Sequence, residues 1–72
     1  MPRKLRALKR SLREAGFRLL PKRRKGRHTM WTHPDLPGVS VNLAGADGDD
    51  AKPYQEDAVR AAVRATKETR LP

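Results

Sequence analysis

The hydrophobic pattern of this chain changes its period twice, and these two changes constrain the fold more than any other feature. Before Gly16, apolar residues recur at helical spacing, as Leu5, Leu8 and Leu12 do. After Gly16 the pattern takes the period of two that is typical of strands, and helical spacing returns after Pro53. The chain is therefore predicted to form a helix, then strands, then a second helix.

Local signals set the bounds of these elements. We predict a helix at 3–15, strands at 17–23, 28–33 and 39–43, and a helix at 53–68. Gly16 is placed to end the first helix, and Pro21 confines the first strand to a sheet edge. In the second strand, the alternation leaves open whether Met30 or Trp31 faces the helices. The acidic, glycine-containing segment 44–52 is predicted to be a flexible connector.

These elements predict an α+β fold of the order α-β-β-β-α. Three sequential strands form an antiparallel sheet, and two amphipathic helices can cover one of its faces. The chain has 72 residues, so we expect one domain spanning 1–72.

The charge of the chain is basic and unevenly distributed. The net charge is +9, with twelve Lys or Arg and one Glu in residues 1–33, against five basic and seven acidic residues in 34–72. Such segregation favours a polyanionic partner, nucleic acid before a membrane. No apolar run approaches the roughly 18 residues of a membrane span, the basic start lacks the apolar core of a signal peptide, and cysteine is absent. We therefore expect a cytoplasmic protein with no membrane partner.

Two groups of cations are candidate contacts for a nucleic acid. Four lie on one flank of the first helix, and the others form the turn between the first two strands, where a glycine allows a tight reversal. The candidate RNA-binding residues are Arg6, Lys9, Arg10, Arg13, Lys22, Arg23, Arg24, Lys25, Gly26 and Arg27. Most charged helix faces are simply solvated. The four cations of the helix have no acid among them, and this favours a phosphate-facing surface.

The residues around the basic turn resemble those of a known family. In chain order they are Gly16-Phe17, the basic turn ending in Lys25-Gly26-Arg27-His28, Thr32-His33-Pro34-Asp35 and Val39-Ser40-Val41. This order is similar to that of the HicA toxins, and the resemblance covers about residues 5–43. HicA toxins are small RNA-cleaving proteins whose α-β-β-β-α fold is like that of double-stranded-RNA-binding domains.

The resemblance implies a function as well as a fold. It implies the toxin of a type II toxin–antitoxin system, an endoribonuclease that degrades mRNA and is neutralised by a HicB-like antitoxin. His28 stands where the family has its catalytic histidine. We expect no metal and no small-molecule cofactor.

The chemistry of RNA cleavage agrees with a histidine at this position. Cleavage without a metal needs a base for the 2′-hydroxyl and positive charge at the phosphate, and histidine titrates near neutral pH. His33, the only other histidine, lies about 16 Å along the strand from His28, too far for a concerted pair. We therefore expect His33 to be structural and to hold the following turn together with Asp35.

Two other classes of function remain open from the sequence. One is a non-catalytic module that uses the same basic face to bind double-stranded RNA through its shape and phosphates. The other is a basic DNA-associated or phage accessory protein, although the sequence shows no helix-turn-helix pattern.

Overall fold

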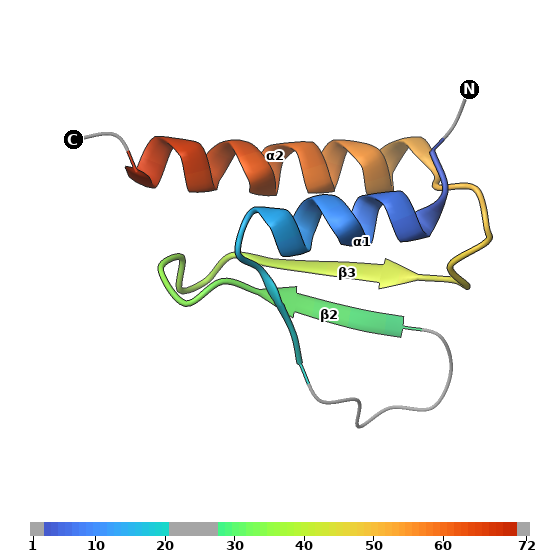
Figure 1. Ribbon diagram of the computed structural model, residues 1–72, viewed down its shortest axis with the longest axis horizontal. Helices are drawn as coiled ribbons and strands as arrows, with labels where there is room; N and C mark the ends of the chain where they lie inside the picture. Colours follow the sequence, from blue (N-terminus) through green and yellow to red (C-terminus); the bar gives the residue numbers. More distant parts are fainter. Residues whose placement is uncertain (1–2, 21–27, 71–72) are drawn as a thin grey trace.

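The computed structural model describes residues 3–20 and 28–70, with side chains up to Glu68. Its elements are α1 (Leu5–Glu14), β1 (Arg18–Leu19), β2 (His28–Thr32), β3 (Ser40–Ala44) and α2 (Pro53–Arg70), shown in Figure 1. The predicted α+β class and the order helix, three strands, helix are confirmed. None of the helices in these two described segments is both long enough and apolar enough to cross a membrane.

The sheet is an antiparallel meander with the order β1-β2-β3. Its centre is β2, in which Trp31 pairs with Leu19 on one side and with Val41 on the other. The two helices lie side by side and run in the same direction, and both pack on one face of the sheet (Figure 1). The other face is left without a helix.

Glycine ends α1 as the sequence predicts, through a Schellman motif. The N–H of Phe17 donates to the Leu12 carbonyl at 2.9 Å, and the N–H of Gly16 donates to the Arg13 carbonyl at 3.0 Å. Gly16 has φ +98°, a conformation that side chains disfavour. Because Phe17 serves this cap and packs into the core, the first strand begins at Arg18 and not at the predicted residue 17.

The other strand bounds also differ slightly from the predicted ones. The N–H of Leu20 donates to the Met30 carbonyl, so pairing extends one residue past β1, while the predicted strand residues 21–23 lie outside the described residues. His33 leaves the ladder at the end of β2, because its ring takes part in the following turn. Val39 also belongs to a turn, since its N–H donates to the Leu36 carbonyl, and β3 therefore begins one residue later than predicted.

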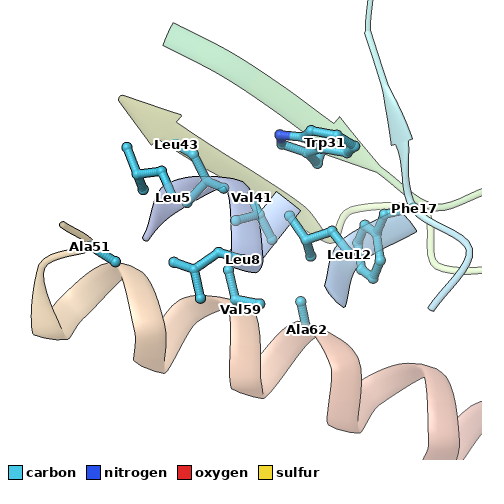
Figure 2. Close-up of a cluster of buried hydrophobic side chains, with 10 residues drawn as sticks. All are labelled: Leu5, Leu8, Leu12, Phe17, Trp31, Val41, Leu43, Ala51, Val59 and Ala62. Carbon is cyan, nitrogen blue, oxygen red and sulfur yellow. The ribbon is translucent and has the colours of Figure 1, made fainter. Parts of the chain in front are cut away.

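The core lies between the two helices and the sheet. Figure 2 shows the three leucines of α1 directed into this space, toward side chains of β3 and α2. The buried apolar residues are Leu5, Leu8, Leu12, Phe17, Trp31, Val41, Leu43, Ala51, Val59 and Ala62. Trp31 is almost fully buried whereas Met30 is exposed, which answers the question that the alternation in β2 left open. The indole N–H donates to the Thr29 hydroxyl at 3.0 Å, and that hydroxyl donates to the Leu43 carbonyl.

The segment after β3 is not the flexible connector that the sequence predicted, because it caps the start of α1. The N–H of Leu5 donates to the Asp49 carbonyl at 2.9 Å, and the N–H of Arg6 donates to the Asp47 carbonyl at 3.1 Å. These donors have no partner within their own helix, and Lys4 provides no side-chain cap. The segment therefore supplies bonds that α1 cannot make for itself.

Side chains of the same segment hold it in place. Asp50 pairs with Lys4 at 2.6 Å, and Asp49 accepts the Ala46 N–H at 2.9 Å. Gly45 has φ +126°, and a Cβ at this position would lie 2.6 Å from Cδ1 of Leu5. The glycine that suggested flexibility is in fact required for close packing against α1.

The start of α2 is tied to the end of β3 by one buried amide. The side-chain oxygen of Gln55 accepts the Lys52 N–H at 2.8 Å, which is the bond from the third helical residue back to the N-cap in a capping box. The side-chain nitrogen of Gln55 donates to the Ala44 carbonyl at 3.1 Å. Pro53 occupies the first helical position, as predicted.

Candidate nucleic-acid interface

One face of the sheet carries the side chains that the helices leave uncovered. Alternation along β2 and β3 directs Thr29, Trp31, Val41 and Leu43 toward the helices. The opposite set, which we call the open face, consists of Arg18, Leu20, His28, Met30, Thr32, Ser40, Asn42 and Ala44. The open face contains no acidic residue, and its large apolar side chains, Leu20 and Met30, are neighbours across β1 and β2.

His28 is the first residue of β2 and lies on this open face. Its backbone pairs with Ala44 of β3, and its side chain is exposed. The imidazole is thus accessible to solvent. The basic turn that precedes it, with the predicted RNA contacts Lys22, Arg23, Arg24, Lys25, Gly26 and Arg27, lies outside the described residues.

His33 has a different environment and is held by the protein itself. Its Nδ1 accepts the Asp35 N–H at 3.0 Å, and its Nε2 donates to the Ala15 carbonyl at 3.1 Å, which assigns the proton of the neutral ring to Nε2. The ring also meets Phe17 edge to face at 5.1 Å between centroids. His33 therefore joins the end of β2 to the end of α1, on the opposite side of the sheet from His28.

Three of the four predicted cations of α1 form an exposed group. Arg6, Arg10 and Arg13 are exposed, and none of them forms a salt bridge with a described residue. The guanidinium carbon of Arg13 lies 5.1 Å from the centroid of the Trp31 ring, a cation–π contact that positions this arginine. We call these three residues the α1 arginine group.

The fourth predicted cation, Lys9, does not belong to this exposed group. Its side chain is only 11% exposed, and its ammonium nitrogen lies 2.5 Å from Oδ1 of Asp47. Lys9 lies at the edge of the buried leucine stripe, so its amine emerges beside the segment that follows β3. Lys9 is thus engaged by Asp47 and is not a free cation, and its predicted contact with RNA phosphate stays a prediction.

Asp47 is the acidic residue that sequence reasoning missed at this surface. The hydrogen bond and charge of Lys9, with smaller contributions from Arg13 and Arg6, hold the pKa of its carboxyl below the ordinary value of 3.8. Asp47 thus remains ionised beside the α1 arginine group and offsets part of its charge. Nothing in the local sequence shows this, because 38 residues separate Asp47 from Lys9.

Arg18 is a cation of the open face that was not among the predicted contacts. It pairs with Thr32 at the opposite end of β2 from His28, and its side chain is exposed. Its alternation with the buried Phe17 is the sequence signal that could have identified it.

Comparisons of the chain with known protein families, with curated proteins and with solved structures find no match. The function is therefore inferred from the residues and their geometry.

Proposed function

We propose that this protein is a HicA-type toxin, a cytoplasmic endoribonuclease that cleaves mRNA without a metal and uses His28 as its catalytic residue. The observation that carries the proposal is the position of His28, an exposed imidazole at the start of β2 on the open face. In the sequence it directly follows the predicted glycine turn, which contains four cations in residues 22–25 and a fifth at Arg27. A phosphate held by such a turn would lie beside the imidazole.

The proposed reaction needs one base and positive charge at the phosphate. His28 takes the proton of a ribose 2′-hydroxyl, and the 2′-oxygen attacks the adjacent phosphorus. The bond from phosphorus to the 5′-oxygen breaks, which leaves a 2′,3′-cyclic phosphate and a 5′-hydroxyl. The leaving oxygen takes its proton from water, because the ring of His33 is engaged at the opposite side of the sheet.

Neutralisation by a HicB-like antitoxin is part of the proposal. An antitoxin that blocks RNA from His28 has to cover the open face. Exposed apolar side chains at Leu20 and Met30 give such a partner area to bury close to the catalytic residue.

A second candidate function is supported by the α1 arginine group. A protein that binds RNA only through its shape and phosphates needs exposed cations and no histidine. Arg6, Arg10 and Arg13 satisfy this requirement without reference to His28.

The two candidates are separated by a cleavage assay with end-labelled RNA in EDTA. The wild-type protein should produce fragments that end in a cyclic phosphate, and His28→Ala should not, while both bind a 2′-O-methyl oligonucleotide equally. Asn42→Ala, which changes another exposed residue of the open face, is the matched control and should cleave normally. Intact RNA that is tightly bound by the wild-type protein would instead establish the binding module. Cleavage by His28→Ala at the wild-type rate would refute the catalytic assignment.

A further inference from the structure

A groove of about 320 Å³ runs along the seam between α1 and α2. Its lining residues are Arg3, Ser11, Glu56, Arg60, Val63, Arg64 and Lys67. The buried residues of α2, Val59 and Ala62, point into the core, so the groove lies on the outer side of the helix layer. It is thus separate from the open face, on which His28 lies.

The lining of this groove is strongly cationic. Arg60, Arg64 and Lys67 follow one another at i, i+4 and i+7, so they form one stripe on α2 with a rise of about 6 Å between the first two. Arg3 approaches from the α1 side of the groove. The only carboxylate in the lining is Glu56, at the N-terminal end of the stripe.

Two contacts show how the arginines are held. Arg3 donates to the Ser11 hydroxyl at 2.9 Å and to the Ala7 carbonyl at 3.2 Å, which fixes its guanidinium along α1. Arg60 forms a surface pair with Asp57 at 3.2 Å. Arg64 and Lys67 form no salt bridge with any residue in the described segments, so they are available to an external anion.

The chemistry of the lining identifies the kind of ligand. Guanidinium groups bind phosphate through paired hydrogen bonds, and a row of cations fits a ligand with regularly repeated charges. An acidic protein would need apolar anchors for stable docking, and Val63 is the single apolar residue of the lining. We propose that the groove binds the phosphate backbone of a nucleic-acid strand, as a second contact surface apart from the face of His28.

The groove combines cations from both halves of the sequence. In the sequence, Arg60, Arg64 and Lys67 belong to the half that is acidic overall. Because the helices pack in parallel, these three residues and Arg3 of the basic half line the same groove. A strand held there would be retained by the protein independently of any cleavage at His28.

The test measures binding of a fluorescent 2′-O-methyl oligonucleotide, which cannot be cleaved through its 2′-oxygen, as a function of salt. The double variant Arg64→Gln, Lys67→Gln should bind more weakly, and its plot of log K against log salt should be shallower by about 1.4, because each lost single-strand contact removes about 0.7. Lys52→Gln removes one exposed cation outside the groove, so it is the control for the effect of a single lost charge, and it should lower the slope by much less than about 0.7.

A variant with the opposite effect keeps the test decisive if the double variant folds poorly. Glu56→Gln removes the carboxylate from the lining and should tighten binding at low salt. A wild-type slope in the double variant, or no gain from Glu56→Gln, would overturn the proposal. Poly-glutamate that displaces the oligonucleotide, at equal charge concentration, more readily from the wild-type protein than from the double variant would also overturn it, because it would assign the groove to an acidic protein. Because cleavage is not measured, these results are independent of whether His28 is catalytic.

Discussion

The ammonium nitrogen of Lys9 lies 2.5 Å from Oδ1 of Asp47, although 38 residues separate them in the chain. The lysine side chain is 11% exposed and the aspartate side chain 64%. This pair joins the basic flank of α1 to the segment after β3, the same segment whose carbonyls cap the helix. It removes one cation from the surface and links the position of α1 to an acidic loop.

The first prediction concerns the pH dependence of stability. Since the pKa of Asp47 is lowered in the folded protein, its stabilising contribution is present above the ordinary value of 3.8 and is lost as the pH falls through the folded pKa. Chemical denaturation between about pH 5 and pH 3 should show a fall in the free energy of unfolding that is smaller in Asp47→Asn. Added salt should weaken the difference, because the carboxylate is solvent-exposed.

Lys9→Gln serves as the matched variant for this measurement. It removes the main partner and should flatten most of the same part of the pH profile, and adding Asp47→Asn should change the profile little further, because Arg13 and Arg6 contribute less to the lowered pKa. An Asp47→Asn profile parallel to that of the wild type would rule out this pair as the source of the pH dependence.

The second prediction tests the ordered state of the segment after β3. Gly45→Ala should lower the free energy of unfolding by about 1–3 kcal/mol, because it imposes φ +126° on alanine and places a Cβ 2.6 Å from Leu5. Gly48→Ala is the control in the same loop, where the nearest atom is Arg6 Nη1 at 4.0 Å, and it should change stability by less than about 0.5 kcal/mol. Urea denaturation measures both. Equal, small effects would mean that the segment is a flexible connector after all.

The third prediction concerns the contact between Gly16 and His33. A Cβ on Gly16 would lie 2.7 Å from Nε2 of His33, so Gly16→Ala should displace the ring and also strain the backbone at φ +98°. His33→Ala should cost about 1–3 kcal/mol through the loss of two hydrogen bonds and the contact with Phe17. The double variant should lose less than the sum, by at least about 0.5 kcal/mol, because removing the ring also removes the clash. Strict additivity in thermal or urea unfolding would contradict this arrangement.

The fourth prediction separates exposed from engaged cations on α1. The double variant Arg6→Gln, Arg10→Gln should bind the 2′-O-methyl oligonucleotide with a slope of log K against log salt that is shallower by about 1.4, if each arginine contributes one phosphate contact. Lys9→Gln should leave the slope nearly unchanged and should lower the free energy of unfolding, since it breaks the pair with Asp47. A slope reduced as much by Lys9→Gln as by an exposed arginine would return Lys9 to the set of RNA contacts.

Local patterns in the sequence were sufficient to predict the elements of this protein. The spacing of Leu5, Leu8 and Leu12 defines the buried side of α1, and Gly16 ends the helix through bonds with its own last turn. Alternation at Val41 and Leu43 likewise defines the buried side of β3. These features depend on residues within a few positions of one another, so their physical causes are present in the local sequence.

The candidate site was only partly accessible to the same reasoning. The position of His28 at the start of a strand followed from the turn and the alternation, and the structure places it on the open face. The expectation that His33 is structural agrees with its bonds to Ala15 and Asp35, but Ala15, the C-cap of α1, lies 18 residues away and no local pattern indicates it.

Contacts between distant segments were decided by the tertiary structure alone. The choice of Trp31 over Met30 as the core residue of β2 depends on which face the helices cover. The engagement of Lys9 by Asp47 and the capping of α1 by the segment after β3 depend on where the chain returns after the sheet. The two helices are separated by the whole sheet in sequence, yet they pack side by side in the same direction (Figure 1). This packing lets Arg3, Arg60 and Arg64 line one cationic groove. Side-chain periodicity determines which face of an element is buried, whereas the partners of its remaining polar groups are determined only when the elements pack.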